Sequence, residues 1–232
     1  MPQRLDVGAV IGRVWRIYVD QAPVLMPAAA VVFVIEGIGA ALLASTGSAA
    51  GYVLAEVIAI VAGILFTGMV VELVADVQDG RRDSSAGQLL RAVVPVLGQL
   101  ILVGLVASIA IVVGFALIIV PGLILVTLWS VFVPVIVLER PPGLGSLGRS
   151  RELVRGNGWQ VFGVLLVLYV LVNVVIWIAD GAADSASTAA GIVVHVVLGV
   201  LSAPLAALAA AVLYFDLRAA SGEPATPSPA LG

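Results

Sequence analysis

The sequence predicts an all-α polytopic membrane protein with six transmembrane helices, arranged as three hairpins that each follow an interfacial amphipathic helix. Of its residues 62% are hydrophobic and 11% charged, whereas a soluble domain has about 45–50% apolar residues. The mean hydropathy is +1.20. Apolar runs of about 20 residues, the length that crosses a bilayer as a helix, recur along the chain. These runs do not alternate apolar and polar residues, which argues against a membrane β-barrel.

The apolar runs divide a single predicted transmembrane domain, residues 1–218, into spans. Between Leu100 and Leu138 the chain has no charged residue, and one straight helix of that length would be roughly twice as long as the hydrocarbon core is thick. We therefore expect the chain to fold back at Pro121-Gly122, the strongest turn signal in this run. The proline-rich residues 219–232 are predicted to be a disordered cytoplasmic tail. The predicted spans are about 22–43, 52–77, 99–120, 121–138, 159–179 and 190–215.

Amphipathic segments precede each pair of spans. In residues 5–20, Val10, Val14 and Trp15 fall on one face of a helix, and Arg13 and Arg16 fall on the other. Such a helix lies flat in the membrane interface. We predict interfacial helices at about 5–20, 84–97 and 144–156. The chain thus repeats one architecture three times: a helix that carries arginine, then two spans joined by a loop without arginine.

The arginines predict the orientation of the protein. All eleven basic residues are arginines, and all of them fall before the first span, between the second and third, between the fourth and fifth, or after the sixth. The three intervening loops contain none. Because basic residues are enriched on the cytoplasmic side, we expect a multi-pass protein of the cell membrane with both termini in the cytoplasm.

Short motifs near the centre and the C-terminal end of the chain resemble the membrane domain of glycerophosphoryl diester phosphodiesterases. The resemblance covers most of residues 5–218. It implies a stand-alone relative of that domain. In the proteins that give the family its name, the domain is joined to a catalytic barrel of about 250 residues, which this chain does not contain, so we expect no phosphodiesterase activity. The resemblance rests on Pro121-Gly122-Leu123, Trp129, Pro134, Leu138-Glu139, Arg149-Ser150, Leu153, Arg155-Gly156, Trp159 and Tyr214-Phe215-Asp216-Leu217-Arg218.

The composition leaves few residues for catalysis. Cysteine is absent and His195 is the only histidine, which excludes thiolate nucleophiles and metal sites built from several histidines. We find no phosphate-binding loop, no serine-nucleophile elbow and no nucleic-acid-binding motif. We therefore expect no enzymatic activity, no catalytic residues, no cofactor, no metal and no nucleic-acid partner.

Four residues near the predicted cytoplasmic surface are candidate contacts for lipid headgroups or for a partner. They are Arg149, Arg151, Arg155 and Trp159. Arginine side chains there can reach anionic headgroups, and tryptophan is typical of headgroup level. The alternative is that these residues serve packing and topology alone.

Four polar residues within the spans form a second candidate set. Glu36, Glu56, Asn173 and His195 fall at a similar predicted depth in the outer half of the membrane. An ionised group at this depth is costly unless it is paired or hydrated, so we expect Glu36 to point inward toward the other three. Two readings stay open: a structural hydrogen-bond network, and a substrate or proton site.

Two functions fit these observations. The first is a non-enzymatic integral membrane module that interacts with membrane lipids or with a membrane protein partner. The alternative is a small-molecule transporter or channel, which the internal repeat and the prolines within the spans favour.

Overall fold

The structure is a computed structural model that describes residues 5–79, 85–183 and 188–224. Within these ranges it describes all side chains except those of residues 40, 41, 44, 86, 175, 176, 178–183 and 188–196. All secondary structure in this part of the chain is helical, which confirms the all-α class. Five of its helical segments are long and apolar enough to cross a membrane, or six if the bent pair α8–α9 counts as one span. The protein is therefore a multi-pass membrane protein.

The helices follow one another with short connections. Their bounds are α1 Val7–Asp20, α2 Ala22–Ala44, α3 Ala49–Gln78, α4 Ala86–Val93, the 3₁₀-helix η1 Val94–Val96, α5 Leu97–Leu117, α6 Ile119–Leu128, α7 Phe132–Pro134, the π-helix η2 Val135–Glu139, α8 Gly145–Val154, α9 Gly158–Ala183 and α10 Thr188–Ala220.

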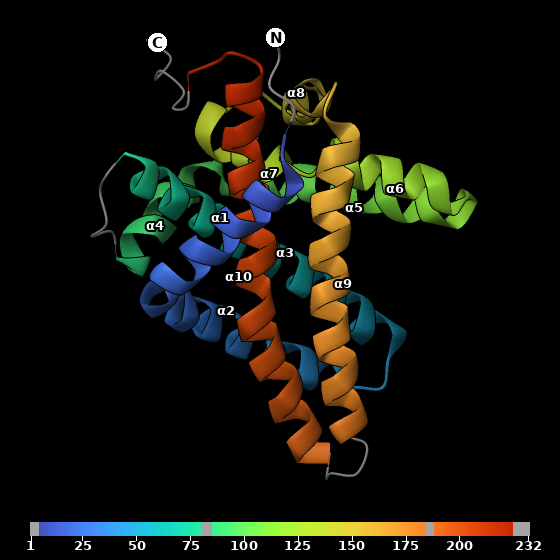
Figure 1. Cartoon of the computed structure of the whole chain (residues 1–232). Coiled ribbons are helices and arrows are strands. Elements are labelled where there is room, and N and C mark those ends of the chain that lie inside the picture. Colours follow the sequence, from blue (N-terminus) through green and yellow to red (C-terminus); the bar gives the residue numbers. More distant parts are fainter. Residues whose placement is uncertain (1–4, 80–84, 184–187, 225–232) are drawn as a thin grey trace.

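The long helices pack in consecutive pairs. Helix α2 packs on α3, α5 on α6, and α9 on α10. The pairs diverge: in Figure 1 the orange and red pair α9–α10 runs downward, while the green α5–α6 pair extends to the right. Helix α10 also contacts α1, α2 and α3, so it is the element on which the other parts of the fold converge.

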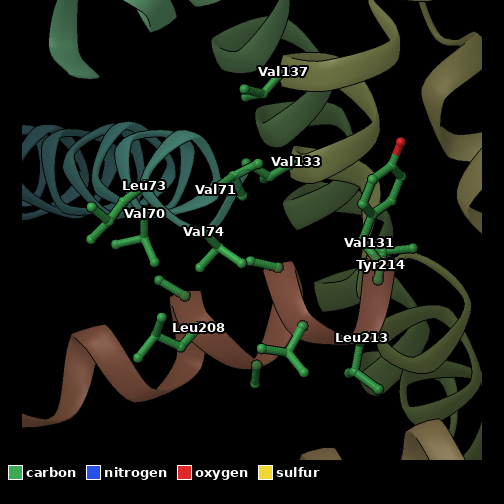
Figure 2. Close-up of a cluster of buried hydrophobic side chains, with 14 of the residues drawn as sticks. Val70, Val71, Leu73, Val74, Val131, Val133, Val137, Leu208, Leu213 and Tyr214 are labelled. Atoms are coloured by element: carbon green, nitrogen blue, oxygen red, sulfur yellow. The ribbon is translucent and has the colours of Figure 1, made fainter. Parts of the chain in front are cut away.

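The core lies where the arginine-bearing segments meet, and the opposite ends of the hairpins are largely exposed. Buried residues concentrate in residues 66–74 of α3 and 205–217 of α10, and in residues 131–137 between them. Figure 2 shows side chains from these three segments in one cluster, with the ring of Tyr214 at its edge. By contrast Ile35 and Ile109 are about two-thirds exposed. Exposed apolar side chains in such numbers fit a lipid environment, because water would penalise them.

Capping residues define several helix starts. Asp6 accepts a hydrogen bond from the backbone N–H of Ala9 at the start of α1, and Ser48 accepts one from Gly51 at the start of α3. Each bond satisfies a donor that the first turn of a helix leaves free. At the start of α4, the side chain of Gln88 accepts a hydrogen bond from the backbone N–H of Ser85.

The chain folds back earlier than the sequence predicted. Helix α5 ends at Leu117, and Ile118 has an extended backbone (φ −158°, ψ 146°) before α6 begins at Ile119. Pro121 lies inside the first turn of α6, where a residue without an N–H costs little. The proline therefore marks the start of a helix and not the turn. Gly122 instead permits a close crossing, because a Cβ there would lie 2.4 Å from the ring of Phe115.

Residues 121–138 lie within one candidate membrane span, Ile119–Glu139, in agreement with the predicted fourth span, but the α-helix within it is interrupted. Helix α6 ends at Leu128, and a short turn leads to α7 and then to the π-helix η2. Pro134 has no N–H to continue the α-helical hydrogen bonds. The N–H of Arg140 then bonds to the carbonyl of Val135 at 3.2 Å, and Arg140 has a left-handed backbone with φ 52°. This widened turn fixes the end of the segment at Glu139.

The beginning of the predicted tail is ordered. Helix α10 continues to Ala220, and the N–H of Glu223 bonds to the carbonyl of Arg218 at 3.0 Å. This turn brings the Glu223 carboxylate back onto the folded domain. No feature of the sequence predicted this turn beyond the acidic residue itself. The rest of the predicted tail, residues 225–232, lies outside the described residues.

Candidate functional site

A network of charged side chains surrounds Glu139 at the end of η2. Its Oε2 accepts a hydrogen bond from Nε of Arg149 at 2.8 Å, and its Oε1 accepts one from Nη2 of the same guanidinium at 3.3 Å. The Oε1 atom also accepts from the hydroxyl of Tyr214 and from Nη1 of Arg218, both at 2.9 Å. One carboxylate therefore joins η2, α8 and α10.

The C-terminal turn adds a second carboxylate to this network. Glu223 accepts a hydrogen bond from Arg149 and lies 3.6 Å from Nη2 of Arg218. Arg218 is only 5% exposed, so both carboxylates offset the cost of burying its charge. The hydrogen bond with Glu139, and then that with Glu223, raise the pKa of Arg149 against the effect of burial. The network is close to electrically balanced, with two guanidiniums facing two carboxylates.

A separate ion pair holds α1 against α10. Arg13 donates a hydrogen bond to Asp216, and the backbone N–H of Leu5 donates to Oδ1 of Asn157 at 3.4 Å. The N-terminal segment is thus bonded to α10 and to the residue that precedes α9, and α1 packs on both of these helices. Glu139 and Asp216 both belong to the motifs that carry the family resemblance, but the sequence could not tell which arginine each would bind.

The candidate headgroup contacts divide into two kinds. The guanidinium of Arg149 is bound by the carboxylates of Glu139 and Glu223, and its role as a headgroup contact stays a prediction. Arg151 and Arg155 are exposed, and Trp159 is 83% exposed, with only an edge contact to the ring of Phe162. The exposed basic and aromatic residues at the α8–α9 junction, Arg151, Arg155 and Trp159, are termed the basic rim below.

Two apolar cavities lie along α9, and the first of them adjoins the basic rim at Trp159. The first, of about 780 Å³, lies between α6 and the start of α9. The second, of about 680 Å³, lies between α5, α6, α9 and α10. Leu123, Thr127 and Phe162 line both, and we call the two cavities together the α6–α9 groove. The sequence held no signal for this groove, because it depends on how far the hairpins diverge.

The structure describes the side chains of three of the four residues in the predicted polar set. Glu36 is half-buried and Glu56 exposed. The amide of Asn173 donates to the carbonyl of Tyr169, one turn back on its own helix, at 2.8 Å. Among the described side chains, no hydrogen bond or ion pair links Glu36, Glu56 and Asn173. The side chain of His195 lies outside the described residues, so the four-residue cluster stays a prediction.

The chain matches no family model, no curated protein and no solved structure. What can be said of its function therefore comes from its own residues and geometry. The geometry offers three features: a balanced polar network that joins helices, an exposed basic rim, and an apolar groove that opens beside that rim.

Proposed function

We propose that this membrane protein is a non-enzymatic module whose cytoplasmic surface binds anionic lipid headgroups. The observation that carries the proposal is that neighbouring arginines in and just after α8 differ in their partners and exposure. Arg149 is bound by two carboxylates, whereas Arg151 and Arg155 are exposed beside Trp159. Basic side chains near an anionic membrane surface each contribute about 1 kcal/mol to binding, and tryptophan favours headgroup level.

The orientation inferred from the arginines supports this proposal. Arg13, Arg149 and Arg218 all form ion pairs around the last turns of α10 and the end of η2, at the same end of the fold as the basic rim. With both termini in the cytoplasm, the basic rim faces the inner leaflet, where anionic lipids attract it. A membrane protein partner with an acidic cytoplasmic segment is the second class of ligand that this surface suits.

The test compares R151Q/R155Q with E152Q, which removes a charge from the same exposed stretch of α8. We measure how much phosphatidylglycerol the purified protein retains relative to phosphatidylcholine, by native mass spectrometry. Loss of two arginine contacts of about 1 kcal/mol each predicts a roughly thirtyfold weaker preference for the anionic lipid. E152Q should keep or raise that preference. An unchanged preference in R151Q/R155Q contradicts the proposal.

We also propose that the chain is a relative of the membrane domain of glycerophosphoryl diester phosphodiesterases. Support comes from Glu139, Arg149, Tyr214 and Arg218, which carry part of the resemblance and which contact one another around one carboxylate. In such a network the motif residues would share one structural role, which is to join α8, η2 and α10.

Transport of a small molecule is the alternative function, and the α6–α9 groove is the observation that favours it. The groove lies between diverging hairpins, as a substrate path between repeated units would. Its lining is mostly apolar, which suits hydrocarbon better than a polar solute. Saturable uptake of a solute by proteoliposomes, abolished by a bulky substitution in the groove, would support transport over the lipid-binding module.

A further inference from the structure

We infer that the α6–α9 groove holds an acyl chain of an anionic glycerophospholipid whose headgroup is bound at the basic rim. This inference rests on the proposed function and goes beyond it, because it assigns a defined site to the chain of one lipid. A lipid surface in general needs only the exposed arginines, whereas a bound lipid needs a slot for its chain.

The dimensions of the groove suit a lipid chain. Its two cavities share Leu123, Thr127 and Phe162, so they form one path from Trp159 to Asn173 along α9. At 1.5 Å per residue this path is about 21 Å long. One leaflet of the hydrocarbon core is about 15 Å deep, so a chain that starts at headgroup level fits along the path. Each cavity also has a volume typical of a small-molecule site.

The chemistry of the lining favours hydrocarbon. Most lining side chains are aliphatic or aromatic, among them Phe115, Leu166 and Val172. Two polar groups in the groove are already bonded to their own helices: Thr127 donates to the carbonyl of Leu123, and Asn173 donates to that of Tyr169, both at 2.8 Å. The Thr127 hydroxyl donor therefore needs no polar ligand, and a methylene chain can lie against it without loss of a hydrogen bond.

The charge at the mouth of the groove selects the headgroup. Gly156, Trp159 and Gln160 line the first cavity, and the exposed Arg155 immediately precedes Gly156. Arg151 lies one helical turn before Arg155. We therefore place the phosphodiester of a lipid whose chain enters the groove beside Arg155, with Arg151 one turn farther from the opening. Glu152, the acidic residue between them, lies 3.8 Å from Arg149, so the rim keeps a net positive charge.

Filling the groove tests the inference. Ala206 is an exposed residue of α10 that lines the second cavity, so A206W should occupy the groove without disturbing the buried core. The matched control is V197W, because Val197 is also exposed and lies on the opposite face of α10 at 100° per residue. Both variants are purified in detergent with dipalmitoyl phosphatidylglycerol, and retention of the lipid is measured by native mass spectrometry.

Each outcome bears on the inference. Each buried methylene contributes about a fourfold factor to binding, so displacing two of them predicts about fifteenfold weaker retention in A206W. V197W should differ from the unmodified protein by less than twofold. Equal retention of the lipid by A206W and by the unmodified protein overturns the inference that the groove holds its acyl chain. If retention then still falls in R151Q/R155Q, the proposed headgroup function survives, and if it does not fall, both fail.

A second measurement covers the case in which A206W does not fold. The unmodified protein is reconstituted with phosphatidylglycerol that carries a diazirine at the end of one chain, and the cross-linked peptides are identified after irradiation. We expect labelling to concentrate in residues 165–173 of α9 and near Ala206. Labelling confined to outward-facing residues such as Ile109 and Val112 overturns the inference.

Discussion

Glu139 is the residue at the centre of the polar network that joins η2, α8 and α10. Its carboxylate binds Arg149, Tyr214 and Arg218, which come from two helices far apart in sequence. In the sequence, Glu139 stands out only as one of the motif residues that carry the family resemblance. The sequence could not indicate Glu223 as a further partner, because that contact needs the turn after α10.

We expect E139Q to destabilise the protein strongly. The substitution preserves the shape of the side chain but removes the charge opposite Arg218, which is 5% exposed. Breaking a buried ion pair by removing one partner costs about 3–5 kcal/mol. The free energy of unfolding, measured by denaturant titration in detergent micelles, should fall by that amount.

E152Q is the matched control for this prediction. The side chain of Glu152 is 72% exposed and lies 3.8 Å from Arg149. Exposed pairs of this kind contribute at most about 1 kcal/mol. Equal stability of E139Q and E152Q would mean that the network around Glu139 does not hold the helices together.

At the scale of the elements, the sequence predicted where helices occur better than how they end. Apolar runs of spanning length and the amphipathic segments coincide with helices in the structure, because periodicity and hydropathy are local properties. The turn at Ile118 and the π-helix η2 were not predicted. The backbone reverses at Ile118, a residue type with no turn preference. Pro121 instead lies in the first turn of α6, and Gly122 allows α6 to pack closely on α5.

The crossing of α5 and α6 should be sensitive to Gly122. A Cβ at this position would lie 2.4–2.7 Å from three ring atoms of Phe115, so G122A must push the ring or the helices apart. Overpacking of this kind costs about 1–3 kcal/mol, which denaturant titration in micelles can measure.

Gly98, in the first turn of α5, provides the control for that substitution. A Cβ there meets no atom within 4 Å, so G98A should be neutral or slightly stabilising because alanine favours a helix. If G122A is as stable as G98A, the close crossing of α5 and α6 does not exist as described.

At the scale of the whole molecule, the hairpins meet at their arginine-bearing ends and diverge at the others. Residues such as Val71 and Leu213 are buried there, while Ile35 and Val112 are exposed toward the opposite ends. This arrangement creates the α6–α9 groove. It could not be predicted from the sequence, because every face of these spans is apolar and the hydropathy pattern does not distinguish a helix–helix contact from a lipid contact.

The central claim, that the arginine-bearing ends all face the cytoplasm, is tested most directly by single cysteines in a chain that has none. Ser45, between α2 and α3, and Ser221, after α10, are both exposed. We predict that S45C reacts with a membrane-impermeant maleimide in intact cells, and that S221C reacts only after the membrane is permeabilised. Labelling of S221C in intact cells, or protection of S45C until permeabilisation, would contradict the orientation and with it the proposed binding of inner-leaflet lipid.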